Sequence, residues 1–253
     1  MEAYRNPRLT SDERAKDLLQ RMTLCEKVGQ LTQSLYGFRI YERHGEEIVL
    51  SDDFYREVER FGGIGAIYGL FRADPWAEKD FESGLDGALA IRTRNRIQEY
   101  VISHSRLGIP VLFTSECPHG HQALDGYLLP VSLASASTFS PSLVEQAFEV
   151  CGKQMREMGV DLALVSVMDV LRDPRWGRSE ETFGEDPYLA SQMARAVVGG
   201  SVHRVFRSWQ SIFARKGKRR VALMQVRQAL VSENCVKFIC RPPVPQSVQA
   251  QSL

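Results

Sequence analysis

The sequence lacks several patterns that would assign it to a large functional class. It has no apolar run of the roughly 18 residues that a membrane-spanning helix requires. It has no GxGxxG motif opening a helix and no Walker lysine, so nothing predicts a nucleotide site. The stretch MEAYRNPRLTSDERAKDLL is polar and has no apolar core of a signal peptide. We therefore expect a soluble cytoplasmic protein with no cofactor and no membrane partner.

Cysteine is scarce, and its spacing excludes two further classes. The five cysteines are odd in number, widely scattered and include no CxxC pair, which argues against a disulfide framework or a zinc site and favours a reducing compartment. Cys117, His119 and His121 form the string CPHGH, whose two histidines are spaced as metal ligands can be. No second cluster completes a site, so we expect no metal.

Charge is unevenly distributed along the chain. The net charge is +1, but residues 1–200 hold 22 basic and 30 acidic residues, whereas residues 201–253 hold ten basic residues and one acid. Such a break predicts two parts, a folded region over 1–200 and a basic tail over 201–253 that is disordered or frame-shifted. The segment ARKGKRR in that tail leaves a nucleic-acid-binding patch as an alternative that we favour less.

Apolar segments alternate with helical ones through the first 200 residues. Strands are predicted within 61–69, 109–115 and 160–170, and an amphipathic helix is predicted over 93–108. Capping boxes begin helices at Thr10 and Thr23. A continuously apolar strand is buried on both faces, which is typical of a parallel sheet, either doubly wound or a (β/α)8 barrel.

Two further helices carry clear start and stop signals. Ser140 is predicted to cap the first, with Pro141 at its first position and Gly159 past its end. Asp186 is predicted to cap the second, with Gly199 ending it. The apolar residues of the first recur at helical spacing and predict a core-facing stripe of Val144, Phe148, Cys151, Met155 and Met158.

Polar residues follow the second and third predicted strands directly. The segment SECPHGHQ follows one strand and LRDPRWGRSEE the other. In both parallel architectures the functional site lies at the carboxyl ends of the strands, so these two segments are expected to meet there.

These segments resemble glycoside hydrolase family 3. The resemblance rests on RDPRWGRSEETFGEDPYL after VDLALVSVMDV, on RMTLCEKVGQLTQ, and on IPVLFTSECPHG followed by LLPVSLASASTFSPSLV. These motifs occur in the family's order and cover about residues 4–200. The resemblance implies the N-terminal part of a (β/α)8-type barrel and a retaining, exo-acting β-glycosidase such as a β-glucosidase, β-xylosidase or N-acetylglucosaminidase.

The resemblance also implies sugar-binding residues. Glu116, the acid before the His-Gly dipeptide, is expected to accept hydrogen bonds from the terminal sugar, and Arg178, which closes PRWGR, is expected to donate to it. Some members have an arginine six residues after the acid, where this chain has Gln122. The alternative for Glu116 is simply to pair with a nearby arginine.

The remaining charged residues of this region are expected to support the site. Asp169 and Glu181 face the same region, while Arg172, Asp173 and Arg175 are expected to pair with nearby acids and shape the loop. For Trp176, packing under the loop is favoured over a role as a sugar platform.

The family's catalytic motifs are missing from this sequence. Its nucleophile lies in a motif resembling Ser-Asp-Trp, preceded by a Lys-His motif, and neither occurs after Gly200. We therefore predict no catalytic residue here, an incomplete barrel, and a marginally stable, inactive chain that self-associates through exposed sheet edges. The expected ligand is a β-linked oligosaccharide or an aryl glycoside, and the alternative function is an inactive carbohydrate-binding fragment.

Overall fold

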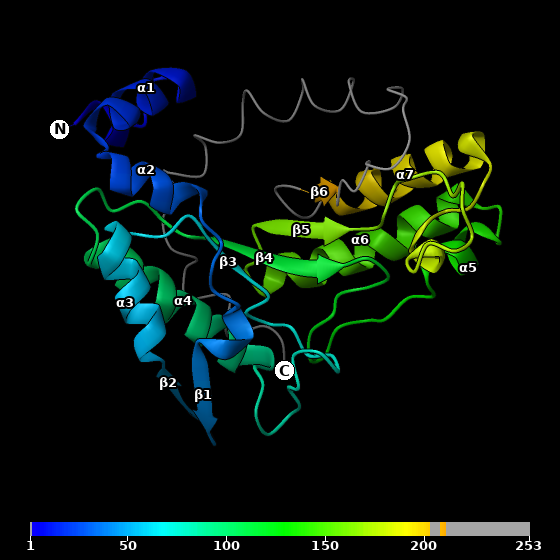
Figure 1. The fold of residues 1–253 in the computed structure, drawn as a ribbon, viewed down its shortest axis with the longest axis horizontal. Helices are drawn as coiled ribbons and strands as arrows, with labels where there is room; N and C mark the ends of the chain where they lie inside the picture. The colour runs from blue at the N-terminus through cyan, green and yellow to red at the C-terminus, as the bar shows by residue number, and fades with distance from the viewer. Residues whose placement is uncertain (1, 203–207, 211–253) are drawn as a thin grey trace.

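The computed structural model describes residues 2–202 and 208–210. Within them the chain forms a mixed α/β fold with a central parallel sheet (Figure 1). The elements follow in the order η1 (Ala3–Arg5), α1 (Ser11–Arg21), α2 (Leu24–Leu31), η2 (Gly37–Arg39), β1 (Tyr41–His44), β2 (Glu47–Leu50), α3 (Asp52–Phe61), β3 (Ala66–Tyr68), α4 (Gly87–Ser103), β4 (Leu112–Cys117), α5 (Ser132–Ala136), α6 (Pro141–Glu157), β5 (Leu162–Val165), η3 (Ser179–Glu181), α7 (Pro187–Val202) and β6 (Ser208–Gln210).

The parallel sheet confirms the prediction made from the apolar strands. Its order is β3-β4-β5-β6, and each of these strands runs parallel to its neighbours. The arrowheads of β4 and β5 point the same way in Figure 1. The strands are shorter than the apolar segments that predicted them, and the hairpin of β1 and β2 and helix α3 went unpredicted.

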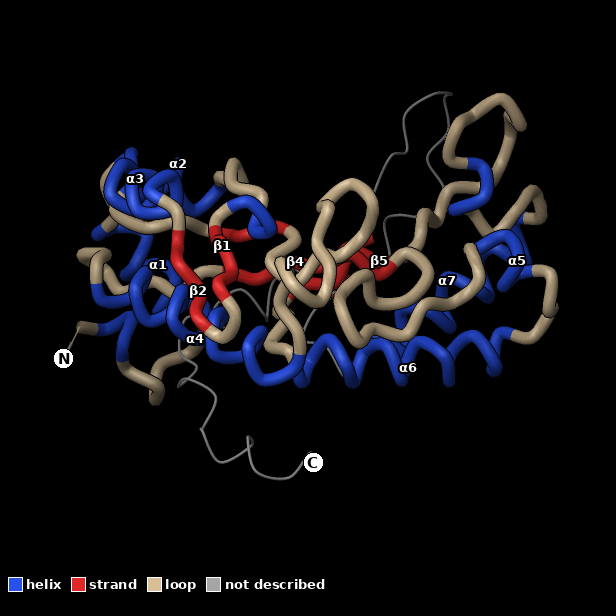
Figure 2. Tube along the Cα trace, turned by 90° about the horizontal axis from the view of Figure 1, so that it is seen from below, coloured by secondary structure: helices blue, strands red, loops and turns tan. Residues whose placement is uncertain are grey.

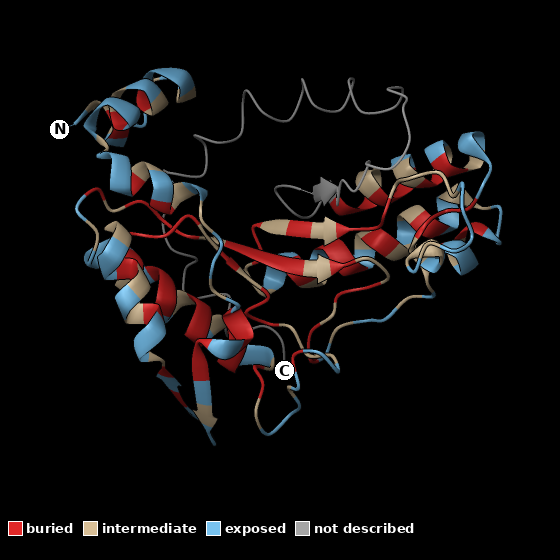
Figure 3. Cartoon of the chain, in the orientation of Figure 1, coloured by how far each residue is buried: buried red, intermediate tan, exposed pale blue. Residues whose placement is uncertain are grey.

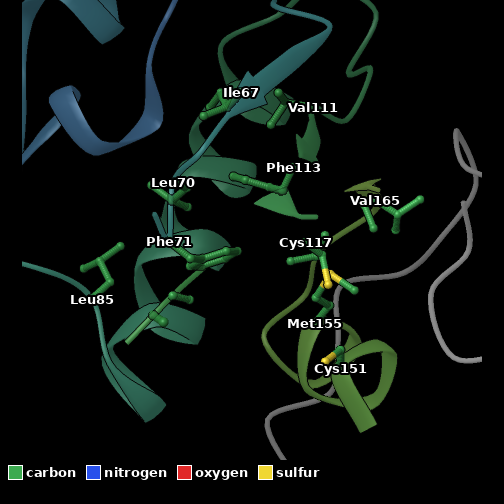
Figure 4. Packing of buried hydrophobic residues seen from close by; sticks show 14 of the residues in the cluster. Ile67, Leu70, Phe71, Leu85, Val111, Phe113, Cys117, Cys151, Met155 and Val165 are labelled. Atoms are coloured by element: carbon green, nitrogen blue, oxygen red, sulfur yellow. The ribbon is translucent and has the colours of Figure 1, made fainter. Parts of the chain in front are cut away.

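Helices α4 and α6 run along one side of the sheet (Figure 2). The predicted stripe of α6 is confirmed: Val144, Phe148, Cys151 and Met155 are buried, and Met158 is partly buried against them. They join a core that includes Ile67 of β3, Phe113 of β4 and Val165 of β5 (Figure 4). Figure 3 shows buried residues along the strands and the inner faces of these helices.

The capping signals were mostly read correctly. Thr10 and Thr23 each form a full capping box with the glutamate three residues on. Asp186 accepts a hydrogen bond from the amide of Tyr188 at 2.8 Å. Ser140 occupies the predicted N-cap position of α6, but its side chain makes no capping hydrogen bond.

The prediction that Gly199 ends α7 was wrong, because the helix continues to Val202. Gly199 and its neighbour Gly200 instead allow α7 to pack closely against α6. A Cβ at Gly199 would meet the Glu145 carboxylate at 2.7 Å, and one at Gly200 would lie 2.9 Å from the Glu149 amide nitrogen. The contact between the two helices therefore leaves no room for a Cβ at these positions, a cause that the local sequence does not display.

The predicted boundary at residue 200 falls inside α7, and Ser208–Gln210 pair with β5 as β6. The rest of the basic tail predicted over 201–253, including the segment ARKGKRR, lies outside the described residues.

Substituting Gly200 with alanine should destabilise the protein. The new methyl group meets the backbone of α6, which cannot yield as a flexible side chain can, so we expect a loss of about 1–3 kcal/mol of unfolding free energy. Gly177→Ala is the matched control, because a Cβ there meets nothing within 4 Å. Urea unfolding of both variants measures the difference, and equal stability of the two would contradict this account of the α6–α7 contact.

Candidate sugar-binding site

Three strands bring their carboxyl ends to one edge of the sheet. Tyr68, the last residue of β3, is in register with Thr114 of β4, and Glu116 of β4 is in register with Leu164 of β5. The loops that follow these strands therefore start side by side. This juxtaposition confirms that SECPHGHQ and LRDPRWGRSEE leave neighbouring strands in the same direction.

Glu116 is the centre of a hydrogen-bonded group at this edge. The hydroxyl of Tyr68 donates to its Oε1 at 2.5 Å, and Nη1 of Arg72 lies 3.4 Å from the same oxygen. The Glu116 side chain is 22% exposed, so it still faces solvent. The pairing of Glu116 with a nearby arginine, which we considered as an alternative to sugar contact, is thus present, and it leaves part of the carboxylate accessible.

Tyr68 remains a hydrogen-bond donor at any ordinary pH. Burial raises the pKa of its phenol, and the hydrogen bond to Glu116 raises it further. A phenol that keeps its proton donates to a carboxylate, which fixes Glu116 as the acceptor.

Arg178 lies on the loop between β5 and α7, directly before η3. Its Nε donates to one Glu181 oxygen at 2.6 Å and its Nη2 donates to the other, forming a two-point pair. The hydrogen bond with Glu181 raises the pKa of Arg178, burial opposes this, and the charges of Glu181, Glu116 and Asp169 raise it further. These carboxylates therefore lie near enough to act on the guanidinium.

Asp169 occupies the same loop and is half-buried. Burial raises the pKa of its carboxyl group, and the charge of Arg178 partly opposes that effect. Asp169 and Glu181 are therefore both electrostatically coupled to Arg178, in the region where the sequence predicted them.

Gln122 and Arg172, the other two predicted supporting residues, have different surroundings. The Gln122 amide donates to the Glu116 carbonyl at 3.1 Å, so Gln122 lies beside the acid through its backbone. Arg172 is exposed and has no ion pair with another described residue, so the expectation that it pairs with a nearby acid was wrong. The reason is that Asp173, the nearest acid in sequence, already forms a two-point pair with Arg175, at 2.9 and 2.8 Å.

His121 is fully buried, and burial lowers its pKa to about 4. Its Nε2 lies 3.0 Å from the hydroxyl of Ser115 in β4, which holds the ring in place. With its pKa lowered to about 4, the ring is neutral at pH 7. Cys117 is also buried. Across the part of the chain that the structure describes, no group of three or more His, Cys, Asp or Glu side chains is arranged to hold a metal ion, and no helix is long and apolar enough to cross a membrane.

Sequence reasoning missed the contribution of the loop after β3. Arg72 and Asp74 lie on this loop, and Arg72 donates to Asp74 through its Nε at 2.7 Å. The sequence carries a signal for it, because LFRAD follows the glycine-rich apolar segment 61–69 just as the other two polar segments follow their strands.

Comparison with known proteins identifies the family of this chain. Residues 23–212 match the family described as "Glycosyl hydrolase family 3 N terminal domain". A periplasmic β-glucosidase of Salmonella typhimurium is 33% identical over 183 residues, covering 72% of this chain and 20% of the relative.

Two solved structures show the same relationship. A β-glucosidase from Erythrobacter marinus superimposes with a TM-score of 0.61 and 31% identity over 79% of this chain and 24% of that one. A D270A mutant of the Listeria innocua β-glucosidase, solved with laminaribiose, gives a TM-score of 0.56 and 28% identity over 74% of this chain and 23% of that one.

The chain belongs to glycoside hydrolase family 3 through the N-terminal domain of that family. It spans about a quarter of the length of the curated relatives it matches.

The coupling between Arg178 and Asp169 can be tested by titration. Because the positive charge favours the ionised carboxylate, Arg178→Met should raise the pKa of Asp169 further. Arg175→Met, which removes a guanidinium held by the exposed Asp173, should leave it unchanged. Carboxyl ¹³C NMR titration measures the pKa of Asp169 in both variants. An unchanged Asp169 pKa in Arg178→Met would show that the two residues are not electrostatically coupled.

Proposed function

We propose that this chain is the first part of the (β/α)8-type barrel of a retaining exo-β-glycosidase similar to β-glucosidases and β-xylosidases. In this proposal it carries the part of the site that holds the terminal sugar. The supporting observation is the position of Glu116, which is the last residue but one of a central parallel strand, accepts a hydrogen bond from Tyr68 and lies within the electrostatic reach of Arg178. In barrel enzymes this edge of the sheet is where active sites are built.

The roles of the two main residues follow from their hydrogen-bonding chemistry. A carboxylate only accepts hydrogen bonds and a guanidinium only donates them, whereas a sugar hydroxyl does both. Glu116 would accept from a hydroxyl of the terminal sugar and Arg178 would donate to one. Glu181 holds the Arg178 fork in one orientation, and Asp169 adds negative charge on the same side. The ligand would be a β-linked oligosaccharide or an aryl glycoside.

Hydrolysis would require groups beyond these. A retaining glycosidase needs two carboxyl groups about 5–5.5 Å apart, one as nucleophile and one as acid/base. The family's Ser-Asp-Trp and Lys-His motifs are absent from these 253 residues. We propose that this chain, as its sequence stands, binds the sugar without hydrolysing it, which makes it an inactive carbohydrate-binding fragment of a hydrolase family. The cytoplasmic location remains a prediction from cysteine usage.

We also propose that the barrel is incomplete and that the chain self-associates. The sheet within the described residues has four strands, and β3 is at its edge. Beyond it, helix α2 exposes Leu24, Val28 and Leu31 at helical spacing, with Leu31 90% exposed. Residues 29–36 meet the outer side of β3 through the hydrogen bond from the Gly65 amide to the Gly29 carbonyl and the bridge between Tyr36 and Tyr68. The exposed apolar stripe of α2 is a surface that further elements of a barrel, or a second copy, would cover.

Sugar binding by the full chain is the direct test. Laminaribiose and p-nitrophenyl β-glucoside should bind, and Glu116→Gln should weaken binding by about tenfold or more, because charge-assisted hydrogen bonds are lost. Asp173→Asn is the matched control, since it removes a carboxylate from an exposed ion pair with Arg175. Titration calorimetry gives the affinities, and release of p-nitrophenol measures turnover.

Two outcomes would count against the proposal. Equal affinity in wild type and Glu116→Gln would remove Glu116 from the sugar site. Turnover of the aryl glycoside by the purified chain would overturn the statement that it binds without hydrolysis.

A further inference from the structure

The guanidinium of Arg72 is held in a fixed orientation. Its Nε donates to Asp74 at 2.7 Å, and Nη2 contacts the same carboxylate. Its plane lies over Trp76, with the guanidinium carbon 4.5 Å from the ring centroid. Only 14% of its side chain is exposed. An arginine anchored on one side by a carboxylate and on one face by an indole has little rotamer freedom left to lose when it binds a ligand.

The Nη1 side of this guanidinium faces the proposed sugar site. Nε and Nη2 are taken by Asp74, whereas Nη1 donates to the Tyr68 hydroxyl and lies 3.4 Å from Oε1 of Glu116. A distance of 3.4 Å is long for a charge-assisted hydrogen bond. One Nη1 hydrogen is therefore used by Tyr68, and the other is directed at Glu116 across a long contact that a sugar hydroxyl could replace.

Backbone hydrogen bonds hold the loop of Arg72 against the segment that follows Glu116. The Ala73 amide donates to the Gln122 carbonyl at 3.1 Å, and the Gln122 amide donates to the Glu116 carbonyl at 3.1 Å. Arg72 also forms an antiparallel bridge with Ala123. Arg72 therefore lies beside Gln122, which follows Glu116 by six residues.

We propose that Arg72 is a sugar-binding residue, supplying a guanidinium to the site from the loop after β3. Glu116 and Arg72 together would hold adjacent hydroxyls of the terminal sugar, one donating to the carboxylate and its neighbour accepting from Nη1. The ligand class is a terminal sugar with a free vicinal diol. This inference rests on the proposed function, and it adds a residue and a recognition pattern to that site.

The test compares two substitutions of Arg72 with a control in the full-length chain. Arg72→Met should weaken laminaribiose binding by about tenfold, because the donor facing the hydroxyl is lost. Arg72→Lys keeps the charge beside Asp74 and Glu116 but loses the planar fork, so it should fold normally and bind with an intermediate affinity. Arg92→Met, which breaks an exposed pair with Glu46, should bind like wild type. Thermal unfolding of each variant checks that it is folded.

Monodeoxy sugars make the test independent of any general damage to the site. The probes are methyl β-glucosides that each lack one hydroxyl. The sugar that lacks the hydroxyl accepting from Arg72 should bind wild type and Arg72→Lys with the same reduced affinity, because Arg72 has no partner on it. The other deoxy sugars should keep the difference between the two proteins.

The results separate the two proposals. Absence of sugar binding in wild type would overturn both. Wild-type binding that is lost in Glu116→Gln but unchanged in Arg72→Lys and Arg72→Met would overturn the inference about Arg72 alone. A difference between wild type and Arg72→Lys that persists equally with every deoxy sugar would also overturn it.

Discussion

The site depends on the parallel pairing of β4 with β3 and β5. This pairing places Tyr68, Glu116 and the loop after Val165 at one edge, although they are far apart in sequence. At the opposite end, Asp161 sets where β5 starts: its amide donates to the Phe113 carbonyl at 2.9 Å, and its carboxylate accepts from the Phe113 amide at 3.1 Å. The Asp161 carboxylate also lies 3.5 Å from the buried Arg94. A shift in the register of β4 and β5 at this end would move Glu116 away from the loop after Val165 at the other end.

Charge at the carboxyl edge is balanced by paired groups rather than by isolated ions. Arg72 is held by Asp74 and Arg178 by Glu181, and Glu116 lies within reach of both guanidinium charges. The Arg178–Glu181 pair is partly exposed, so it contributes little to stability by itself. Both pairs fix the orientation of a planar donor before any ligand arrives, which lowers the entropy lost on binding.

Local sequence was sufficient for features that depend on short-range chemistry. The capping boxes at Thr10 and Thr23, and the buried stripe of α6, follow from spacing within a single helix, and all were confirmed. Features that depend on a distant partner were missed or misread. Gly199 was interpreted as a stop signal, yet it is a contact point with Glu145 of another helix. Arg172 was expected to pair, yet Asp173 was already taken by Arg175.

The sequence by itself determined the alternation of strands and helices, the parallel sheet and the likeness to glycoside hydrolase family 3. It did so because burial of apolar strands and the residue types of a sugar site leave local traces. Only the tertiary structure decided that Tyr68 and Arg72 join Glu116, since the polar residues after residue 69 indicate a strand-end loop but not which residue of a neighbouring strand they meet. Hydrogen bonds across a sheet connect residues through space, and the identity of a partner strand is set by the packing of the whole chain.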